Sequence, residues 1–434
     1  MTTQENLKIT PLNQWHKQAF ANMADFGGFE MPLWYPSGVK TEHLSVLHSA
    51  GLFDTSHMSS IMVIGDKALE LLNFCFTRNI QALLNGRCAY GAFLSENGHC
   101  IDDAIVYKFS NTVFMVCVNA GMGQTITRHL QDHCPDDTPN YISDETIDII
   151  DLSGQIAKID IQGKNSARIL SHVIQSPEMV FSKMSYFSFK GLFDLPFKNT
   201  NVSELSDQDC VRLKDGTPLL LSRSGYTGEF GFEIFIQSDA VVSLWMNLLS
   251  LGKEMGITAC GLGARDSLRA GACLPLSHQD IGDWKFINHP WEFALPFNET
   301  CNGFTKSFLG SDALLFETND SFIYPYVGDS LRKVGAGKNT RVIHSSGNDI
   351  GFVLTCATDM AITWVNDQII SINSKNISDS IPIKGISCGF VHVSQKLETG
   401  SRLTLVDGKR NISICIVNDI RPDRTARRPI KEFI

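Results

Sequence analysis

Two adjacent aspartates, Asp102 and Asp103, lead directly into an apolar run in the segment "GHCIDDAIVYK" at 98–108. Adjacent residues of a strand point to opposite faces, so we expect one carboxylate to face inward while the other faces solvent. An inward carboxylate can accept a proton or stabilise a developing positive charge. Taken alone, the same pattern is also typical of a polar turn before a strand.

A glycine-rich corner is indicated by "SRSGYTGEFGFEIFI" at 222–236, which has three regularly spaced glycines around Tyr226 and then an alternating apolar run with Glu233. A phosphate-binding loop would be followed by a helix, whereas a strand pattern follows here, which excludes that interpretation. A buried carboxylate needs hydrogen-bond donors. Glu233 is therefore predicted to meet donors, and the edge of a flat ligand with two adjacent N–H groups, such as a guanidine-like or pterin ring, would suit it. The alternative is a solvent-facing glutamate on a half-buried strand.

Two arginines, Arg265 and Arg269, lie four residues apart in "ACGLGARDSLRAGA" at 259–272, where glycines open a predicted helix. Residues at this spacing share a helix face, and like charges there repel by about 0.2–0.5 kcal/mol. An anion bound between them would relieve this repulsion. A surface pair bridged by acidic side chains is the alternative.

Metal and nucleophile motifs are weak. His129 and His133 are four residues apart with Cys134 beside them, which could hold zinc in principle. No second pair with ligand spacing is evident, so we expect a surface helix and no metal. There is no G-x-S-x-G elbow, so acyl transfer through a covalent intermediate is not supported.

The bulk properties exclude several classes of partner. A chain of 434 residues predicts two or three domains. A net charge of −9 without a long basic run argues against nucleic acid. Twelve scattered cysteines without C-x-x-C and a start without signal-peptide features predict a reducing, cytoplasmic location. The longest apolar runs, such as "VFMVCV" at 113–118, fall far short of the roughly 20 residues of a membrane helix.

The elements that must position these residues mix strands and helices without regular alternation, which favours an α+β fold. Strands are predicted at "SSIMVIG", "DAIVYKF", "TVFMVCVNA", "IAKIDIQG", "TPLLLS" and "GFEIFIQ". Helices are predicted at "KALELLNFCF", "GQTITRHLQDH", "NSARILSHVI" and "DAVVSLWMNLLSLGKEMG". A polar stretch at 317–321 marks a boundary, and the strand-rich chain beyond it predicts a small β domain. The basic end at 421–434 is expected to be a solvated strand end.

Eight segments, taken together and in order, resemble the aminomethyltransferase (T-protein) family of the glycine cleavage system. The resemblance is good over about residues 10–315 and loose in the C-terminal domain. The segments are "DFGGFEMPLWYPSG", "HSAGLFDTSHM", "ENGHCIDDAIVYK", "VCVNA", "IDIQGKNSARIL", "SRSGYTGEFGFEIF", "CGLGARDSLR" and "SFLGSDALL".

The resemblance implies a cloverleaf of three domains around a folate channel. Residues 1–318 would form the folate-binding region of two interleaved α+β subdomains, and residues 319–434 a C-terminal β-barrel-like domain.

The resemblance also implies a tetrahydrofolate-dependent one-carbon transferase. A T-protein takes the aminomethyl group from the lipoyl arm of the H-protein, releases ammonia and leaves 5,10-methylenetetrahydrofolate. Relatives include tetrahydrofolate-dependent demethylases or methyltransferases of small methylated compounds, such as dimethylsulfoniopropionate or methoxylated aromatics. Others bind folate without transferring anything, and these carry a cysteine in the glycine corner, which here reads Gly-Tyr-Thr-Gly.

Site residues follow by position. Asp103 is similar to the essential aspartate near the reactive folate nitrogens, Glu233 to the glutamate that pairs with the pterin donors, and Tyr226 to the tyrosine lining the same pocket. Further positions that match family motifs or pocket residues are Met58, Tyr90, Tyr107, Asn119, Tyr186 and Arg265.

The residues that differ from the family pattern lie mainly in the segments that would face the second substrate, and less in those that would face the folate. The family helix continues Arg-Leu-Glu-Ala-Gly, whereas here Arg269 is followed by Ala270, Gly271 and Ala272, so a carboxylate is missing. The segment at 273–297 replaces a family motif and adds His278, and insertions lie near 191–217 and 360–385. The alternatives therefore differ mainly in the one-carbon donor.

Overall fold

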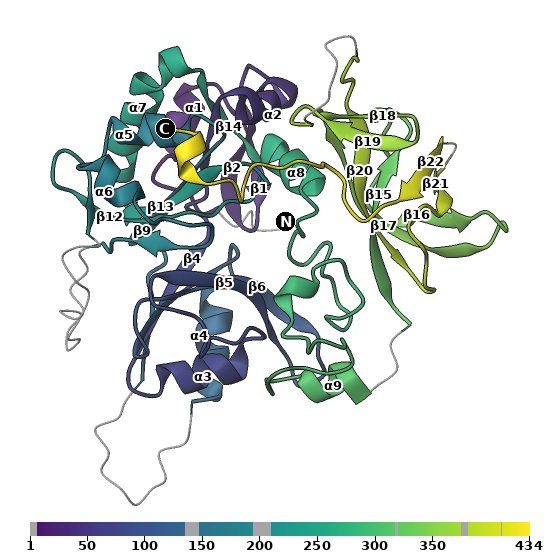
Figure 1. The fold of residues 1–434 in the computed structure, drawn as a ribbon, viewed down its shortest axis with the longest axis horizontal. Helices are drawn as coiled ribbons and strands as arrows, with labels where there is room; N and C mark the ends of the chain where they lie inside the picture. The colour runs from purple at the N-terminus through teal and green to yellow at the C-terminus, as the bar shows by residue number, and fades with distance from the viewer. Residues whose placement is uncertain (1–6, 135–146, 194–209, 317–319, 375–380, 409) are drawn as a thin grey trace, which may run out of the picture.

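The computed structural model describes residues 7–134, 147–193, 210–316, 320–374, 381–408 and 410–434. Three lobes, each built on its own sheet, are arranged like the leaves of a clover (Figure 1).

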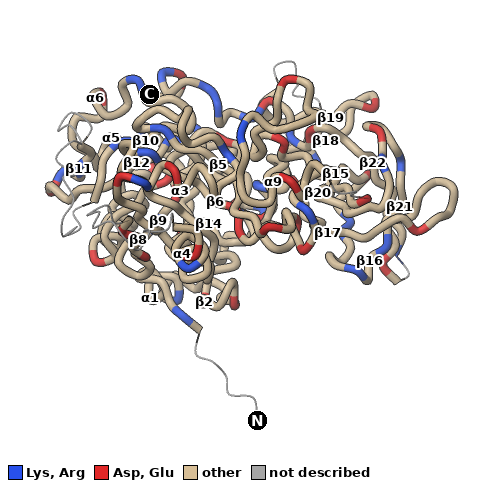
Figure 2. The backbone as a smooth tube through the Cα atoms, turned by 90° about the horizontal axis from the view of Figure 1, so that it is seen from below, with Lys and Arg blue, Asp and Glu red and all other residues tan. Residues whose placement is uncertain are grey.

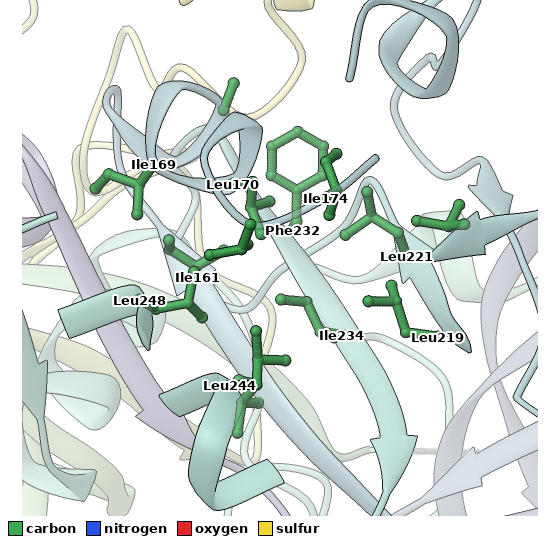
Figure 3. Packing of buried hydrophobic residues seen from close by; sticks show 14 of the residues in the cluster. Ile161, Ile169, Leu170, Ile174, Leu219, Leu221, Phe232, Ile234, Leu244 and Leu248 are labelled. Atoms are coloured by element: carbon green, nitrogen blue, oxygen red, sulfur yellow. The ribbon is translucent and has the colours of Figure 1, made fainter. Parts of the chain in front are cut away.

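The largest lobe is built on a seven-stranded sheet whose inner strands are long and apolar. Its path runs β10 (Phe189–Lys190), β12 (Pro218–Ser222), β13 (Gly231–Gln237), β9 (Ile156–Gln162), β3 (Ala50–Asp54) and β14 (Ile257–Cys260), with β11 (Val211–Arg212) paired to β12. Helices α5 (Ser166–Ser171) and α7 (Val241–Leu251) bury their apolar faces against one side of this sheet (Figure 3). In Figure 3, Ile161 and Ile234 of the strands lie toward Leu248 and Leu244 of α7, whereas Phe232 lies beside Leu170 and Ile174.

The second lobe is a five-stranded antiparallel sheet. Its order is β5 (Arg87–Leu94), β6 (Cys100–Lys108), β7 (Val113–Val118), β4 (Ser59–Ile64) and β8 (Asp148–Asp151). Helices α3 (Ala68–Cys75) and α4 (Gly123–Asp132) cover one face. The other face packs against the large sheet through a shared core that includes Tyr107, Met115 and Phe235. The two sheets therefore lie face to face in this region.

The third lobe is a closed barrel. Its strands, in order, are β15 (Phe322–Gly328), β20 (Ile386–Val393), β17 (Asp349–Asp359), β16 (Gly337–His344), β21 (Arg402–Asp407) and β22 (Arg410–Ile416). A hairpin of β18 (Ile362–Val365) and β19 (Gln368–Ser371) extends from it. The α+β class and the C-terminal barrel are thus confirmed.

Helix α8 (Leu262–Gly271) lies where the large lobe meets the barrel (Figure 1). It packs on β17 of the barrel and on β2 (Phe29–Trp34) and α2 (Val39–His48) of the large lobe. A Cβ atom on Gly271 would lie 1.7 Å from a carboxylate oxygen of Asp359, so this close approach requires glycine. The backbone of α8 therefore lies directly against a side chain of the barrel here.

The strands and helices expected from periodicity are all present. The predicted helix at 165–174 is shorter, because α5 ends at Ser171 and the chain then turns. The predicted segment at 239–256 ends as a short 3-10 helix, Lys253–Met255, after α7. The boundary at 317–321 and the insertions near 191–217 and 360–385 lie partly outside the described residues. The described part of the second insertion includes the β18–β19 hairpin.

The expectation of a solvated basic end was wrong. The chain leaves the barrel after Ile416 and returns across the large lobe (Figure 1). Phe433 stacks on Phe230 with ring centroids 4.0 Å apart, and Ile430 joins the core of the large lobe. The guanidinium group of Arg223 donates to the main-chain carbonyl of Ala426 at 2.9 Å. Apolar residues between the basic ones thus anchor this end.

Figure 2 shows Lys and Arg positions interspersed with Asp and Glu positions along the chain. Within the described residues, none of the helices has the length and apolar character needed to cross a bilayer. All twelve cysteines are free.

Candidate functional site

Asp103 is fixed at the centre of a small polar cluster on the five-stranded sheet. The carboxylate is 9% exposed. Its Oδ2 accepts a hydrogen bond from the Tyr90 hydroxyl group at 2.8 Å, and its Oδ1 accepts one from Nδ2 of Asn119 at 2.8 Å. Asp103 shares its strand face with Ile105 and Tyr107, which pack into the core between the two sheets. The carboxylate therefore lies on the face of the sheet opposite helices α3 and α4, in a nearly dry environment.

Asp102 is also buried, which corrects the expectation that one member of the pair faces solvent. It lies within β6, so the polar-turn alternative is wrong as well. Its carboxylate accepts the backbone N–H of Asn119 at 2.9 Å and the Ser277 hydroxyl at 3.0 Å. Burial, together with the charge of Asp103, raises the pKa of Asp102 to about 7. Exposed His278 places Nε2 at 3.7 Å from Oδ1 of Asp102.

Glu233 is buried in the facing sheet, with only 4% of its surface exposed, so the solvent-facing alternative is wrong. It meets donors as predicted, and those donors belong to the protein. Lys158 Nζ lies 2.5 Å from Oε1, and the Ser224 hydroxyl donates to Oε2. Burial alone would lower the pKa of Lys158, but the carboxylates of Asp160 and Glu233 outweigh it and raise that pKa to about 12.

A chain of charge contacts joins Glu233 to Tyr226. Lys158 bridges Glu233 to Asp160, whose Oδ1 lies 2.7 Å from Nζ. Arg265 pairs with the other oxygen of Asp160 at 2.7 Å, and its guanidinium carbon lies 4.8 Å from the centre of the Tyr226 ring. Burial raises the pKa of Tyr226, Arg269 lowers it, and the charge of Asp103 raises it further. Tyr226 therefore lies at the end of this chain of contacts, beside Arg265.

The glycine corner closes on protein groups. An added Cβ on Gly225 or Gly231 would collide with the side chain of Gln162, at 2.0 Å and 2.6 Å. Nε2 of Gln162 donates to the carbonyl of Ser224 at 3.2 Å, and its Oε1 accepts from the Thr227 hydroxyl at 2.9 Å. The two glycines therefore allow the corner to pack directly against the Gln162 side chain. This packing positions Tyr226 and Glu233.

The remaining predicted residues lie outside these hydrogen-bonded clusters. Met58 is half-buried beside the core between the two sheets. Tyr107 is fully buried there, edge-on to Phe189 at 5.3 Å and to Phe235 at 5.5 Å. Tyr186 is half-buried, and the guanidinium group of Arg427 lies over its ring at 5.6 Å.

Each arginine of the α8 pair has its own acidic partners, Asp160 for Arg265 and Asp266 with Asp280 for Arg269; none of these acids bridges the two, and the pair is not on the surface. Arg269 is fully buried and contacts Asp280 and, at 2.7 Å, Asp266. Asp280 also accepts the Thr355 hydroxyl of the barrel at 2.6 Å. The divergent segment that follows α8 is therefore tied to the barrel through Arg269.

Sequence reasoning missed Lys158 and Asp160. Both lie on β9, where every residue is buried. Their signal was available, because two opposite charges two positions apart in "IAKIDIQ" share one strand face and must pair when that face is covered.

Comparison with known proteins decides the family. The model described as the GCVT N-terminal domain matches residues 12–206 and 208–297, more than half of the chain. The chain belongs to the aminomethyltransferase family. Among relatives named aminomethyltransferase, that of Geobacillus sp. (strain WCH70) is 32% identical over 350 residues, which covers 80% of this chain and 86% of the relative. That of Koribacter versatilis is 33% identical over 393 residues, covering 86% and 93%.

The family assignment also agrees with the fold. The crystal structure of glycine cleavage system aminomethyltransferase T from Bartonella henselae matches with a TM-score of 0.73 at 24% identity, covering 98% of this chain and 99% of that chain. The match extends over all three lobes. Members of this aminomethyltransferase family are transferase enzymes, so the two facing carboxylate clusters are candidates for an enzyme site.

Proposed function

We propose that this protein transfers a one-carbon unit to tetrahydrofolate as an aminomethyltransferase, forming 5,10-methylenetetrahydrofolate and ammonia. The observation that carries the proposal is the Asp103 carboxylate, buried on the five-stranded sheet and held at both oxygens by Tyr90 and Asn119. A carboxylate fixed in this way is prepared to stabilise positive charge without reorganising.

The residues present fit a reduced pterin. Each oxygen of Glu233 has one protein donor, from Lys158 or Ser224, while a carboxylate oxygen can accept two. Glu233 thus has acceptor capacity for a ring edge that carries adjacent N–H donors. Met58 and the ring of Tyr226 offer apolar surface nearby. Tyr107 and Tyr186 would support this pocket from behind.

Tetrahydrofolate would supply the nucleophilic nitrogens that receive the one-carbon unit. Asp103 would stabilise the positive charge that develops on the transferred carbon. Asp102 can hold or release a proton near neutral pH, because its pKa is raised to about 7. Asn119 bonds to both carboxylates and keeps them in register. Arg265 would fix the orientation of Tyr226.

A second candidate is a tetrahydrofolate-dependent demethylase or methyltransferase of a small methylated compound. It is favoured by the divergent segment after α8, because Ser277 and His278 of that segment contact Asp102. A folate-binding protein without transferase activity is disfavoured by the absence of cysteine in the Gly-Tyr-Thr-Gly corner.

The proposed partners follow from the chemistry. Aminomethyl transfer would require a lipoylated H-protein as donor, and demethylation a small methylated molecule. A cytoplasmic location is supported by the twelve free cysteines.

The test is to incubate the protein and tetrahydrofolate with aminomethylated H-protein or with a panel of methylated small molecules. Methylene product with ammonia supports the aminomethyltransferase, and 5-methyl product supports the demethylase. Folate binding without turnover of any donor would overturn both enzymatic proposals.

A further inference from the structure

We propose that Cys75, His129 and His133 form a binding site for a divalent metal ion of the zinc class, distinct from the carboxylate clusters. Ligand atoms of these three residues all lie within 4.8 Å of one another. Spacing alone predicted no metal here, because Cys75 belongs to α3 whereas both histidines belong to α4 or its end. The fold brings the two helices together.

The position of the helices separates this cluster from Asp103. Helices α3 and α4 cover the face of the five-stranded sheet that carries Phe93 and Val106. The ring of His129 packs edge-on against Phe93, with centroids 6.0 Å apart. Asp103 lies on the opposite face. A metal ion held by α3 and α4 would therefore have a structural role and would not take part in the proposed transfer reaction.

The orphaned nitrogen of His129 points to a ligand. Nε2 of His129 is buried and has no hydrogen-bond partner among the residues that the structure describes. Buried polar atoms in folded proteins are nearly always paired with protein or water. The neutral histidine ring carries a lone pair on one nitrogen, which this unpartnered Nε2 can offer to a metal ion. A metal ion would satisfy that lone pair.

His133 is oriented as metal-binding histidines commonly are. Its Nδ1 lies 2.8 Å from the carbonyl oxygen of His129, so Nδ1 carries the proton and donates it. The lone pair then resides on Nε2. A hydrogen bond from the second ring nitrogen to a backbone carbonyl fixes the tautomer and ring plane of a histidine ligand. Two histidines four residues apart on one helix face, with this arrangement, supply two nitrogen ligands.

Cys75 completes the set with sulfur, and burial raises the pKa of its thiol to about 12. Metal binding would release this proton to solvent as the sulfur–metal bond forms. Lys306 donates to the carbonyls of Asn73 and Phe76, which flank Cys75 in the chain. Two imidazoles and one thiolate suit zinc, with water in the fourth position.

The test is cobalt titration of the full-length protein after removal of metal with a chelator. One equivalent of Co²⁺ should produce thiolate-to-cobalt charge transfer in the near ultraviolet and intense visible bands of a four-coordinate ion. Zinc should displace the cobalt and raise the thermal midpoint. Cys75→Ser should abolish the charge-transfer band, and His129→Gln or His133→Gln should weaken affinity by at least about tenfold.

Cys134→Ser is the matched control, because this thiol is adjacent to His133 and half-buried. It should leave the cobalt spectrum unchanged. If Cys75→Ser does not fold, the half-buried His133 provides the variant that decides. Absence of the charge-transfer band in the parent protein would overturn the proposal. So would a band that is lost with Cys134→Ser, or one that persists at full affinity in His133→Gln.

Discussion

The hydroxyl group of Tyr90 donates a hydrogen bond to Oδ2 of Asp103 across the β5–β6 pair, at 2.8 Å. Asp103 lies opposite Ala92 in the register of the two strands, so Tyr90 reaches it diagonally on the same face. Burial and the charge of Asp103 raise the pKa of Tyr90 well above its usual value, which keeps the hydroxyl protonated and donating. The sheet register thus fixes both the position and the protonation of this partner.

Asp103→Asn should lower turnover by about 10²–10³-fold while changing the dissociation constant for tetrahydrofolate little. The amide preserves shape but removes the charge that would stabilise the transferred carbon. Steady-state kinetics and calorimetric titration with tetrahydrofolate measure the two quantities. Asp239→Asn, at an exposed aspartate, is the control and should retain parental turnover. Full activity of Asp103→Asn would remove this residue from its proposed role.

Tyr90→Phe should reduce kcat by about tenfold or more, because a hydrogen bond to a charged group contributes about 1.5–3 kcal/mol. The ring, which packs beside Phe293 with centroids 5.7 Å apart, is retained. The fold should therefore be unaffected, as circular dichroism can verify. Unchanged kcat in a folded variant would show that Asp103 does not depend on this donor.

Glu233→Gln should weaken tetrahydrofolate binding by about 1–3 kcal/mol, since the pterin donors would lose an anionic acceptor. The amide can still accept from Lys158 through its oxygen, and Lys158 keeps its pair with Asp160, so folding should survive. Isothermal titration gives the affinity. Glu178→Gln, at an exposed position, should bind like the parent protein. Equal affinities for both variants would place the pterin elsewhere.

The buried Asp102 should make stability depend on pH in a defined window. Its pKa is about 7 in the native protein and about 4 in the unfolded chain, so between these values the native state holds more protons. The contribution of Asp102 to the free energy of unfolding is therefore greatest below about pH 4. It decreases as the pH rises from about 4 to about 7.

The Asp102→Asn substitution removes this titration, so the difference between the two proteins reports Asp102 alone. Other groups titrate in both proteins, for example His57, because burial lowers its pKa to about 4. The thermal midpoint of the parent protein, measured relative to Asp102→Asn, should fall as the pH rises across the window and level off above it. Parallel midpoints for the two proteins over the whole range would contradict the raised pKa.

Phe433→Ala should destabilise the protein by about 3 kcal/mol, because it removes a buried ring stacked on Phe230. Phe433 is 9% exposed, whereas Phe316 is 81% exposed and serves as the matched control. Phe316→Ala should change stability by less than about 0.5 kcal/mol. Urea unfolding compares the two. Equal effects would mean that the returning chain end contributes nothing to the large lobe.

Strand and helix positions were predictable because alternation and helical periodicity are strong in the buried sheets. Ser59–Ile64 and Gly231–Gln237, for example, form the predicted strands. The candidate site was partly predictable for the same reason, since a charge in an apolar strand must find a partner. The partner itself was not predictable. Lys158 reaches Glu233 from a neighbouring strand, and no local pattern encodes that pairing.

The exposure of the Asp102–Asp103 pair was mispredicted because alternation assigns faces without saying what covers them. The Asp102 and Asp103 carboxylates both accept from Nδ2 of Asn119, and the divergent segment around Ser277 shields Asp102 from water. The returning chain end was missed because its basic composition conceals three anchors, Thr425, Ile430 and Phe433, all buried. Long-range packing decided both cases.

The two-way attachment of the barrel restricts how it can move. After β22 the chain places Arg421 in a buried ion pair with Asp359 at 2.5 Å, and the segment beyond it is anchored on the large lobe. A domain attached through one connecting segment can rotate about that segment. The barrel is instead attached to the large lobe by the chain on both sides of the junction. Rotation of the barrel would have to break the buried Arg421–Asp359 ion pair or detach the C-terminal segment from the large lobe. A hinge motion at this junction is therefore not expected to open a path for a donor.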